Sequence, residues 1–270
     1  MAISSHFMTL PDDKPLAASK SLVMGEYKRV LDALREDRLS LFYQPVVRAN
    51  AGNFVVFHEA LARIHMPDGT IIPAGQFMPM VDNTRIGTEV DLKTIALAMA
   101  TLSACPDLRL SVNLSTRSMR NPDWIKQLEI HDKTVCERLI IEVTESGAMT
   151  NVEATTAFLD KVRILGCALA IDDFGTGSTS FRYFRDFKFD AIKIDGMFIR
   201  DISRNKDSRV LVEALVKICN QFEMFTVAEF IETEEDANVA LQLGIDYFQG
   251  YLIGKPTAKP TAIDQSWSAT

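Results

Sequence analysis

The feature that most constrains the fold of this chain is a regular alternation of short apolar runs with amphipathic segments. The runs have the length of buried strands, and most of the intervening segments carry apolar residues at helical spacing. The apolar runs are residues 39–46, 53–64, 108–113, 138–143, 167–172, 190–195, 224–229 and 246–252, and helical patterns span residues 89–104, 152–165, 208–222 and 234–243. Eight strands alternating with helices predict an α/β fold, a (β/α)8 TIM-like barrel rather than a doubly wound sheet.

The first two runs depart from this pattern, because only Arg48-Ala49-Asn50-Ala51-Gly52 separates them. A crossover between parallel strands needs about a dozen residues or more, whereas a hairpin needs only a few. We therefore expect a hairpin here and one antiparallel strand near the N-terminus.

The domain limits follow from where the periodicity starts and stops. Residues 1–24 carry Pro, Asp, Lys and Ser without periodicity and are predicted to form a tail or linker. Tyr27, Val30, Leu31 and Leu34 then share one helical face. We expect a single barrel domain over residues 25–260 and a C-terminal tail over residues 261–270.

The charge balance limits the range of ligands. The chain has 36 acidic and 29 basic residues, a formal net charge of −7. A protein that binds DNA or RNA polymers needs a basic face, so we expect no such partner. A nucleotide substrate stays possible, since bound metal ions neutralise local acid.

Cysteine, histidine and the N-terminal sequence indicate the compartment. The cysteines are far apart in the sequence, so reduced thiols are the better interpretation. The histidines lack the spacing of a zinc site. The N-terminus lacks the basic and apolar regions of a signal peptide, and no apolar stretch approaches about 20 residues. We expect a cytoplasmic protein without a membrane span.

Polar residues end nearly every apolar run. They are Glu59, Asn113, Glu142, Asp172, Asp173, Lys193, Asp195, Glu229 and Gln249. In a barrel the C-terminal ends of the strands meet at one rim, where active sites lie. Carboxylates at close range need cations, and oxygen ligands without Cys or His suit Mg²⁺ or Mn²⁺. Two such ions would clamp both oxygens of a phosphoryl displacement.

Each of these residues has a simpler interpretation when taken alone. A single strand-end glutamate is usually a capping or surface acid, and Asn113 is as suited to a turn as to a ligand. Asp172 and Asp173 could begin a plain loop, and Lys193 could be an ion-pair partner for the same acids. The recurrence of the pattern in successive strands favours a metal site.

The ordered motifs resemble the EAL-domain cyclic di-GMP phosphodiesterases of bacterial signalling, from about residue 39 to residue 256. They are Tyr43-Gln44-Pro45, Glu59-Ala60-Leu61-x-Arg63, Asn113-Leu114-Ser115, Glu142-Val143-Thr144-Glu145, Asp172-Asp173-Phe174-Gly175-Thr176-Gly177, Lys193-Ile194-Asp195, Ala228-Glu229-x-x-Glu232-Thr233 and Gln249-Gly250-Tyr251. The order of so many motifs makes the resemblance specific.

The resemblance implies a role for each motif residue. Glu59, Asn113, Glu142 and Asp172 would bind one metal ion, and Asp172, Asp173 and Glu229 would lie near a second. Lys193 would contact the attacking water and Gln249 would steady the metal–water network, so Lys193, Glu229, Glu59 and Gln249 form the expected catalytic set. Gln44, Leu61, Arg63, Asn113 and Asp195 would bind the dinucleotide. Glu145 and Glu232 would hold the loop that follows Asp173.

The activity implied by the resemblance is hydrolysis of cyclic di-GMP to linear pGpG with two Mg²⁺ or Mn²⁺ ions, inhibited by Ca²⁺. A homodimer is expected, as is an upstream sensory or GGDEF-type domain in a longer parent protein. The alternatives are a catalytically silent cyclic di-GMP receptor and an unrelated barrel that uses Mg²⁺ on an enolate. The retained ligands argue against the first, and Gln44 and Arg63 against the second.

Two positions depart from the family pattern. Ser178-Thr179-Ser180-Phe181 stands where the family usually has a bulky Tyr or His before paired serines, and Phe230 replaces a glycine after Glu229. Neither change removes a ligand, so we expect them to affect rate and loop coupling more than the type of reaction.

Overall fold

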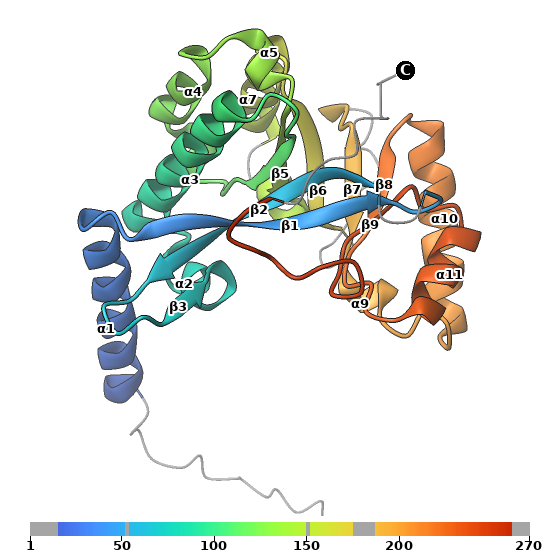
Figure 1. The fold of residues 1–270 in the computed structure, drawn as a ribbon, viewed down its shortest axis with the longest axis horizontal. Coiled ribbons are helices and arrows are strands. Elements are labelled where there is room, and N and C mark those ends of the chain that lie inside the picture. Colours follow the sequence, from blue (N-terminus) through green and yellow to red (C-terminus); the bar gives the residue numbers. More distant parts are fainter. Residues whose placement is uncertain (1–15, 52–53, 150–151, 175–186, 261–270) are drawn as a thin grey trace, which may run out of the picture.

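The central feature of this computed structural model, which describes residues 16–51, 54–149, 152–174 and 187–260, is a closed barrel of strands (Figure 1). The strands are β1 (Leu39–Arg48), β2 (Val55–His65), β3 (Ile71–Pro73), β4 (Leu110–Asn113), β5 (Leu139–Thr144), β6 (Ala168–Phe174), β7 (Ala191–Ile194), β8 (Phe225–Ala228) and β9 (Tyr247–Phe248). Their order is β1-β9-β8-β7-β6-β5-β4-β2-β3, and pairing of β1 with β2 closes the ring. The predicted barrel is confirmed.

The predicted hairpin is also confirmed. Strand β1 runs antiparallel to both of its neighbours, β2 and β9, whereas β2 pairs in parallel with β4. The hairpin is long, with Leu39 opposite Ile64 at its far end, so it extends past the barrel. There β3 pairs antiparallel with β2, a strand that the sequence analysis missed because three residues carry no periodicity.

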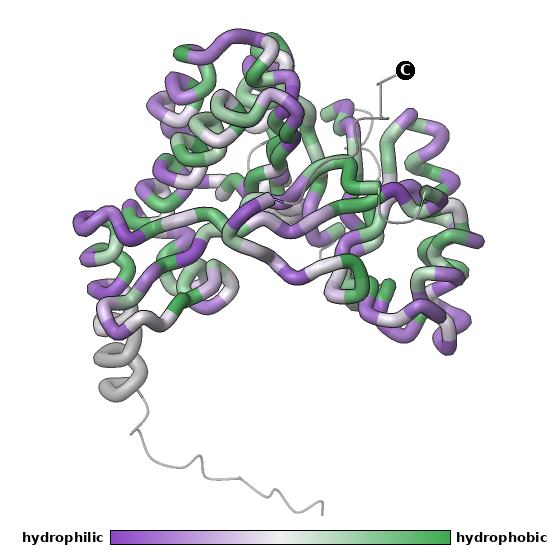
Figure 2. The backbone as a smooth tube through the Cα atoms, in the orientation of Figure 1, coloured by the Kyte–Doolittle hydropathy of each residue, from purple (hydrophilic) through white to green (hydrophobic). Residues whose placement is uncertain are grey.

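Helices surround the barrel and the far end of the hairpin. They are α1 (Leu16–Arg35), α2 (Ala74–Val81), α3 (Arg85–Ala104), the 3-10 helix η1 (Ser118–Arg120), α4 (Pro122–Glu129), α5 (Lys133–Cys136), α6 (Glu145–Met149), α7 (Val152–Ile164), α9 (Gly196–Ile199), α10 (Lys206–Gln221) and α11 (Glu234–Gln242). Figure 2 shows hydrophilic and hydrophobic stretches alternating along α10 and α11, as expected for helices that bury one face. Among the described residues, no helix is both long and apolar enough to span a membrane.

Helix α1 begins at Leu16, inside the segment predicted to be a tail over residues 1–24. The early start has a local reason, since Leu16 to Met24 contains good helix formers and no Gly or Pro. The predicted apolar face of this helix packs as expected, because Val30 is buried in a cluster with Phe77 of α2 and Ile64 of the extended hairpin. The hairpin extension, α1 and α2 thus form a satellite core beside the barrel.

Successive residues of each strand point alternately to the core under the helices and to the barrel interior. This alternation places the polar residues inside the barrel. In β5, Leu139, Ile141 and Val143 pack in the main core between barrel and helices. Glu142 lies between two of them in sequence, so its side chain points to the opposite face, into the barrel. The same period places Lys193 inside the barrel between Ile192 and Ile194 of β7.

Gly250 is required by a close backbone contact next to the site. A Cβ at this position would overlap the backbone nitrogen and oxygen of Ile231. The contact is fixed, because Ile231 N–H donates to Gln249 O at 3.0 Å and Leu252 N–H donates to Ile231 O at 3.0 Å.

We therefore predict that Gly250→Ala lowers the free energy of unfolding by about 1–3 kcal/mol, since the backbone has to move to admit the methyl group. Gly75→Ala is the matched control, because a Cβ there meets no atom within 4 Å. Urea unfolding of both variants measures the difference. Equal stability of Gly250→Ala and the parent protein would contradict the close contact.

Candidate active site

The Lys193 ammonium group lies among four buried carboxylates at one end of the barrel interior. Its Nζ is 2.9 Å from Glu229 Oε1, 3.0 Å from Glu142 Oε2 and 3.2 Å from both Glu59 Oε2 and Asp172 Oδ1. The lysine side chain is only 1% exposed. We call Lys193 and these four acids the carboxylate ring. The ion-pair interpretation of Lys193 is thus observed, and its contact with a water stays a prediction.

Parallel pairing brings these residues together from distant parts of the sequence. In adjacent strands Asn113 lies opposite Glu142, and Thr144 lies opposite Asp172. Glu229 directly follows β8, and its backbone N–H donates to Ile194 O at 3.2 Å. The strand-end residues therefore share one rim, as the sequence predicts.

Two amides donate to Glu59 and fix its orientation, and a third amide, that of Gln44, contacts one of them. Asn113 Nδ2 donates to Glu59 Oε1 at 2.6 Å, and Gln249 Nε2 donates to Glu59 Oε2 at 2.5 Å. Gln249 Nε2 also reaches Gln44 Oε1 at 3.3 Å, while Gln44 Nε2 donates to Gly254 O at 3.2 Å. Glu59 of β2 thus joins Lys193 to Asn113 at the end of β4 and to Gln249 directly after β9.

The pKa values show that one lysine does not neutralise the ring. Burial raises the pKa of Glu229 to about 8, Asp172 and Glu59 add to the shift, and Lys193 opposes it. Burial likewise raises the pKa of Glu142 and of Asp172 against the charge of Lys193. Only Glu59 has a lowered pKa, because Lys193 and its hydrogen bonds outweigh burial. A further cation would lower the electrostatic cost of this arrangement.

The same region offers ligands for metal ions. Asp172, Asp173 and Glu229 each place a carboxylate oxygen within 4.8 Å of the other two. Asp173 adopts a left-handed backbone, with φ of 54°, which turns it away from the strand direction. Among the described residues, no donor bonds the buried oxygens Glu142 Oε1 and Gln249 Oε1. Oxygen donors of this kind fit a hard divalent ion such as Mg²⁺ or Mn²⁺.

The predicted substrate-binding residues lie beyond the ring. Glu59, Leu61 and Arg63 share one face of β2, since they are spaced by two. The Arg63 guanidinium stacks on the Phe42 ring at 5.3 Å and donates to Ala62 O at 2.9 Å. Asp195 is different, because its carboxylate accepts from Met197 N at 2.8 Å and caps α9. A ligand that bonds to the same carboxylate oxygen of Asp195 therefore competes with the Met197 N–H.

The two predicted loop-holding acids differ in environment. Glu145 is the first residue of α6 and is 2% exposed, which contradicts the alternative of a solvated acid. Glu232 is half exposed and lies 3.8 Å from Arg200 Nη2. Their expected partner beyond Phe174 lies in residues 175–186, outside the described part of the chain, as do Ser178 to Phe181.

Phe230, the second departure from the family pattern, is described. It has a left-handed backbone, with φ of 54°, where a side chain is strained. Its ring packs under the Arg200 guanidinium at 4.2 Å and closely covers Gly196. Glu229, the residue before Phe230, keeps its contact with Lys193.

Asp91 is a site-supporting residue that the sequence analysis missed. It lies in α3, is 6% exposed, and accepts from Ser115 Oγ at 2.6 Å and from Ser115 N at 3.3 Å. These bonds hold the turn directly after Asn113. The signal in the sequence was an acid on the apolar face formed by Val90 and Ile95, although a single helical acid is usually exposed.

Comparison with known proteins gives one consistent family. Residues 28–256 match the EAL domain. The chain is 35% identical over 235 residues to cyclic di-GMP phosphodiesterase PdeF of Escherichia coli, which covers 84% of this chain and 31% of PdeF. It is 31% identical over 232 residues to the bifunctional diguanylate cyclase/cyclic di-GMP phosphodiesterase MucR of Pseudomonas aeruginosa, covering 83% of this chain and 34% of MucR.

A solved structure of a relative supports the same family. The MucR phosphodiesterase in complex with c-di-GMP superimposes with a TM-score of 0.74 at 29% identity, covering 87% of this chain and 97% of that one. The barrel and its rim of acids define the class, and the chain belongs to the EAL-domain family. It spans about a third of the length of PdeF and MucR.

The role of Lys193 in stabilising the carboxylate ring can be tested by measuring the stability of the protein in the absence of metal ions. We predict that Lys193→Met lowers the free energy of unfolding by about 3–5 kcal/mol in chelator at neutral pH, because it leaves buried carboxylates unpaired. The raised pKa of Lys193 means that its stabilisation is present below the unfolded value and is lost only at strongly alkaline pH.

The cost of Lys193→Met should shrink at about pH 5, because Asp173, with a pKa of about 6, then binds a proton, whereas Glu229, with a pKa of about 8, is already largely protonated at neutral pH. Lys217→Met is the control, since Lys217 is 72% exposed and pairs with Glu213 at the surface. Denaturant unfolding at both pH values gives the comparison. A pH-independent loss equal to that of Lys217→Met would rule out the ring as described.

Proposed function

We propose that this chain is a cyclic di-GMP phosphodiesterase that hydrolyses its substrate to linear pGpG with two divalent metal ions. The carboxylate ring at the end of a barrel is the observation that carries the proposal, because it gathers oxygen ligands where barrel enzymes act. The names of PdeF and MucR supply the substrate and the reaction. The retained ligands favour an enzyme over a silent receptor.

The metal ions have a definite set of proposed ligands. Glu59, Asn113, Glu142 and Asp172 would hold one ion, and Asp172, Asp173 and Glu229 the other. Bound Mg²⁺ or Mn²⁺ would act as a Lewis acid on the phosphate and lower the pKa of water. The hydrogen bonds of Glu59 to Asn113 and Gln249 orient that carboxylate before an ion arrives.

The remaining residues act on the substrate and on water. Arg63, beside the ring on β2, suits a phosphate oxygen, and Gln44 and Leu61 line the same approach. Lys193 Nζ donates a hydrogen bond to the attacking water. The water oxygen bonds to phosphorus and gives up a proton, the bond to the 3′-oxygen breaks, and this oxygen takes up a proton as pGpG forms.

The direct test is incubation of the protein with cyclic di-GMP followed by chromatography. We expect pGpG with Mg²⁺ or Mn²⁺ and none after chelation. Ca²⁺ should support binding without turnover, since its larger and looser shell positions water poorly. Glu59→Ala should abolish turnover and weaken metal-dependent binding, whereas Lys193→Ala should lose rate and keep measurable binding.

The outcomes separate the enzyme from its alternative. Tight binding of cyclic di-GMP with no product over hours would favour a receptor. Full activity in Ca²⁺ alone, or near-parental rates in Lys193→Ala, would contradict the roles assigned to the metal and to the lysine.

Glu145 gives a separate test of how the ligands are positioned. Because Glu145 is buried three residues beyond Glu142 and is proposed to hold the segment after Asp173, Glu145→Ala should shift the metal ligands. A displacement of about 1 Å costs on the order of 100-fold in rate. Turnover and melting temperature are measured together, with Glu153→Ala, on the exposed side of α7, as the control.

A fall in turnover with a nearly unchanged melting temperature is the expected result. Unchanged turnover would exclude the positioning role of Glu145. A large drop in melting temperature would assign the residue to the fold instead.

The cellular context is also a proposal. We propose a cytoplasmic homodimer in which this barrel follows a sensory or GGDEF-type domain of a longer protein. The bifunctional name of MucR and the short span of each relative that this chain covers support a multidomain parent.

A further inference from the structure

The barrel interior has two layers of different chemistry. Each site residue on β5 to β9 has an apolar residue two positions earlier on the same inward face. The pairs are Ile140 and Glu142, Ala170 and Asp172, Ala191 and Lys193, Val227 and Glu229, and Tyr247 and Gln249. The polar layer is the carboxylate ring, and the apolar layer lies toward the N-terminal ends of the strands.

The apolar layer does not fill its space. TIM-type barrels usually pack bulky Val, Ile and Leu side chains in these layers. Here the inward positions of the apolar layer on two neighbouring strands carry only methyl groups, from Ala168 and Ala170 of β6 and Ala191 of β7. A cavity of about 250 Å³ results, which these three alanines line together with Val227 and Tyr247. We call it the lower cavity.

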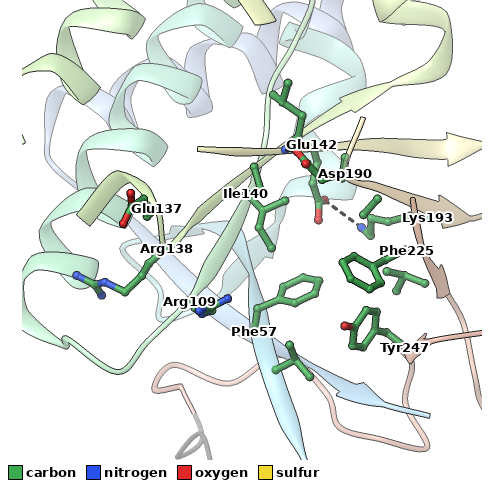
Figure 3. Close-up of a pocket in the computed structure, with 16 residues that line it drawn as sticks. Phe57, Arg109, Glu137, Arg138, Ile140, Glu142, Asp190, Lys193, Phe225 and Tyr247 are labelled. Atoms are coloured by element: carbon green, nitrogen blue, oxygen red, sulfur yellow. Dashed lines mark hydrogen bonds and ion pairs between the residues drawn. The ribbon is translucent and has the colours of Figure 1, made fainter. Parts of the chain in front are cut away.

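The lower cavity opens at the end of the barrel opposite the carboxylate ring, and its mouth is aromatic. Phe57, Phe225 and Tyr247 gather there, and the Phe225 and Tyr247 rings meet edge to face at 5.6 Å (Figure 3). Phe225 is 54% exposed, which is unusual for a phenylalanine that begins a barrel strand.

The charged groups of the lower cavity lie at its edges. Glu142 and Lys193 form its polar ceiling and are joined to each other (Figure 3). At the mouth, Arg138 donates to Leu102 O at 2.7 Å and to Cys105 O at 2.8 Å, and Asp190 Oδ2 accepts from Leu169 N at 2.8 Å. These two side chains are thus bound to backbone. Arg109 and Glu137 also line the cavity, so its lining carries acidic and basic groups of both signs, and the rest of the lining is mainly apolar.

We propose that the lower cavity is a second binding site, which takes a small, uncharged, planar aromatic molecule. An apolar cavity of about 150 Å³ is sufficient for benzene, so the larger lower cavity accommodates a two-ring compound. Phe57, Phe225 and Tyr247 offer ring faces and edges to such a ligand. A polar substituent on the ligand would reach the Glu142 and Lys193 ceiling.

The position of this site has a functional consequence. Its ceiling is formed by two members of the carboxylate ring, so a ligand in the lower cavity touches the floor of the active site from the opposite end of the barrel. The site therefore needs no access through the active-site mouth at Arg63 and Gln44. The binding itself does not depend on the proposed hydrolytic activity.

The test uses 2-naphthol as the probe, with metal-free protein and no substrate. Calorimetric titration should show binding to the parent protein. Ala191→Leu should weaken it at least about tenfold by filling the cavity. Ala100→Leu, on an exposed position of α3, is the volume-matched control and should bind like the parent. Arg63→Ala, at the active-site mouth, should also leave binding unchanged.

A second variant keeps the test decisive if Ala191→Leu fails to fold. Phe225→Ala removes a half-exposed ring at the mouth and should weaken binding about fivefold. No binding of 2-naphthol to the parent protein would overturn the proposal. So would binding that Arg63→Ala abolishes while both lower-cavity variants retain it, because the probe would then occupy the active site.

Discussion

The structure depends on one buried electrostatic arrangement, in which Lys193 meets four carboxylates inside the barrel. Burying charge is costly unless each charge has a partner, and here one ammonium serves four acids from four other strand ends. The excess negative charge explains why the pKa values of Glu229, Glu142 and Asp172 are raised. It also explains why a divalent cation suits this site.

The two-residue period of a strand connects this arrangement to the rest of the molecule. Outward residues such as Ile141 and Ile192 join the core under the helices, while inward residues such as Glu142 and Lys193 form the ring. The amides of Gln249 and Asn113 then orient Glu59, and Asp91 holds the turn after Asn113. Below the ring, the inward faces of β6 and β7 carry alanines, which leaves the lower cavity.

The sequence predicted the parts of the structure that carry a local pattern. Eight apolar runs with polar ends predicted the barrel, the rim and the carboxylate ring, and the short 48–52 link predicted the hairpin. It missed β3, which is too short for a period, and the start of α1 at Leu16, which lies ahead of the apolar face that begins at Tyr27. Asp91 and the lower cavity were also missed, because both depend on contacts between distant strands and helices.

The central claim, that the carboxylate ring is a metal centre, is tested most directly by anomalous scattering from crystals grown with Mn²⁺. The account predicts anomalous peaks among Glu59, Asn113, Glu142 and Asp172, and among Asp172, Asp173 and Glu229. It also predicts that Lys193 loses some of its carboxylate contacts to the ions. An absence of any peak inside the ring, with Lys193 still bound to all four acids at saturating Mn²⁺, would contradict it.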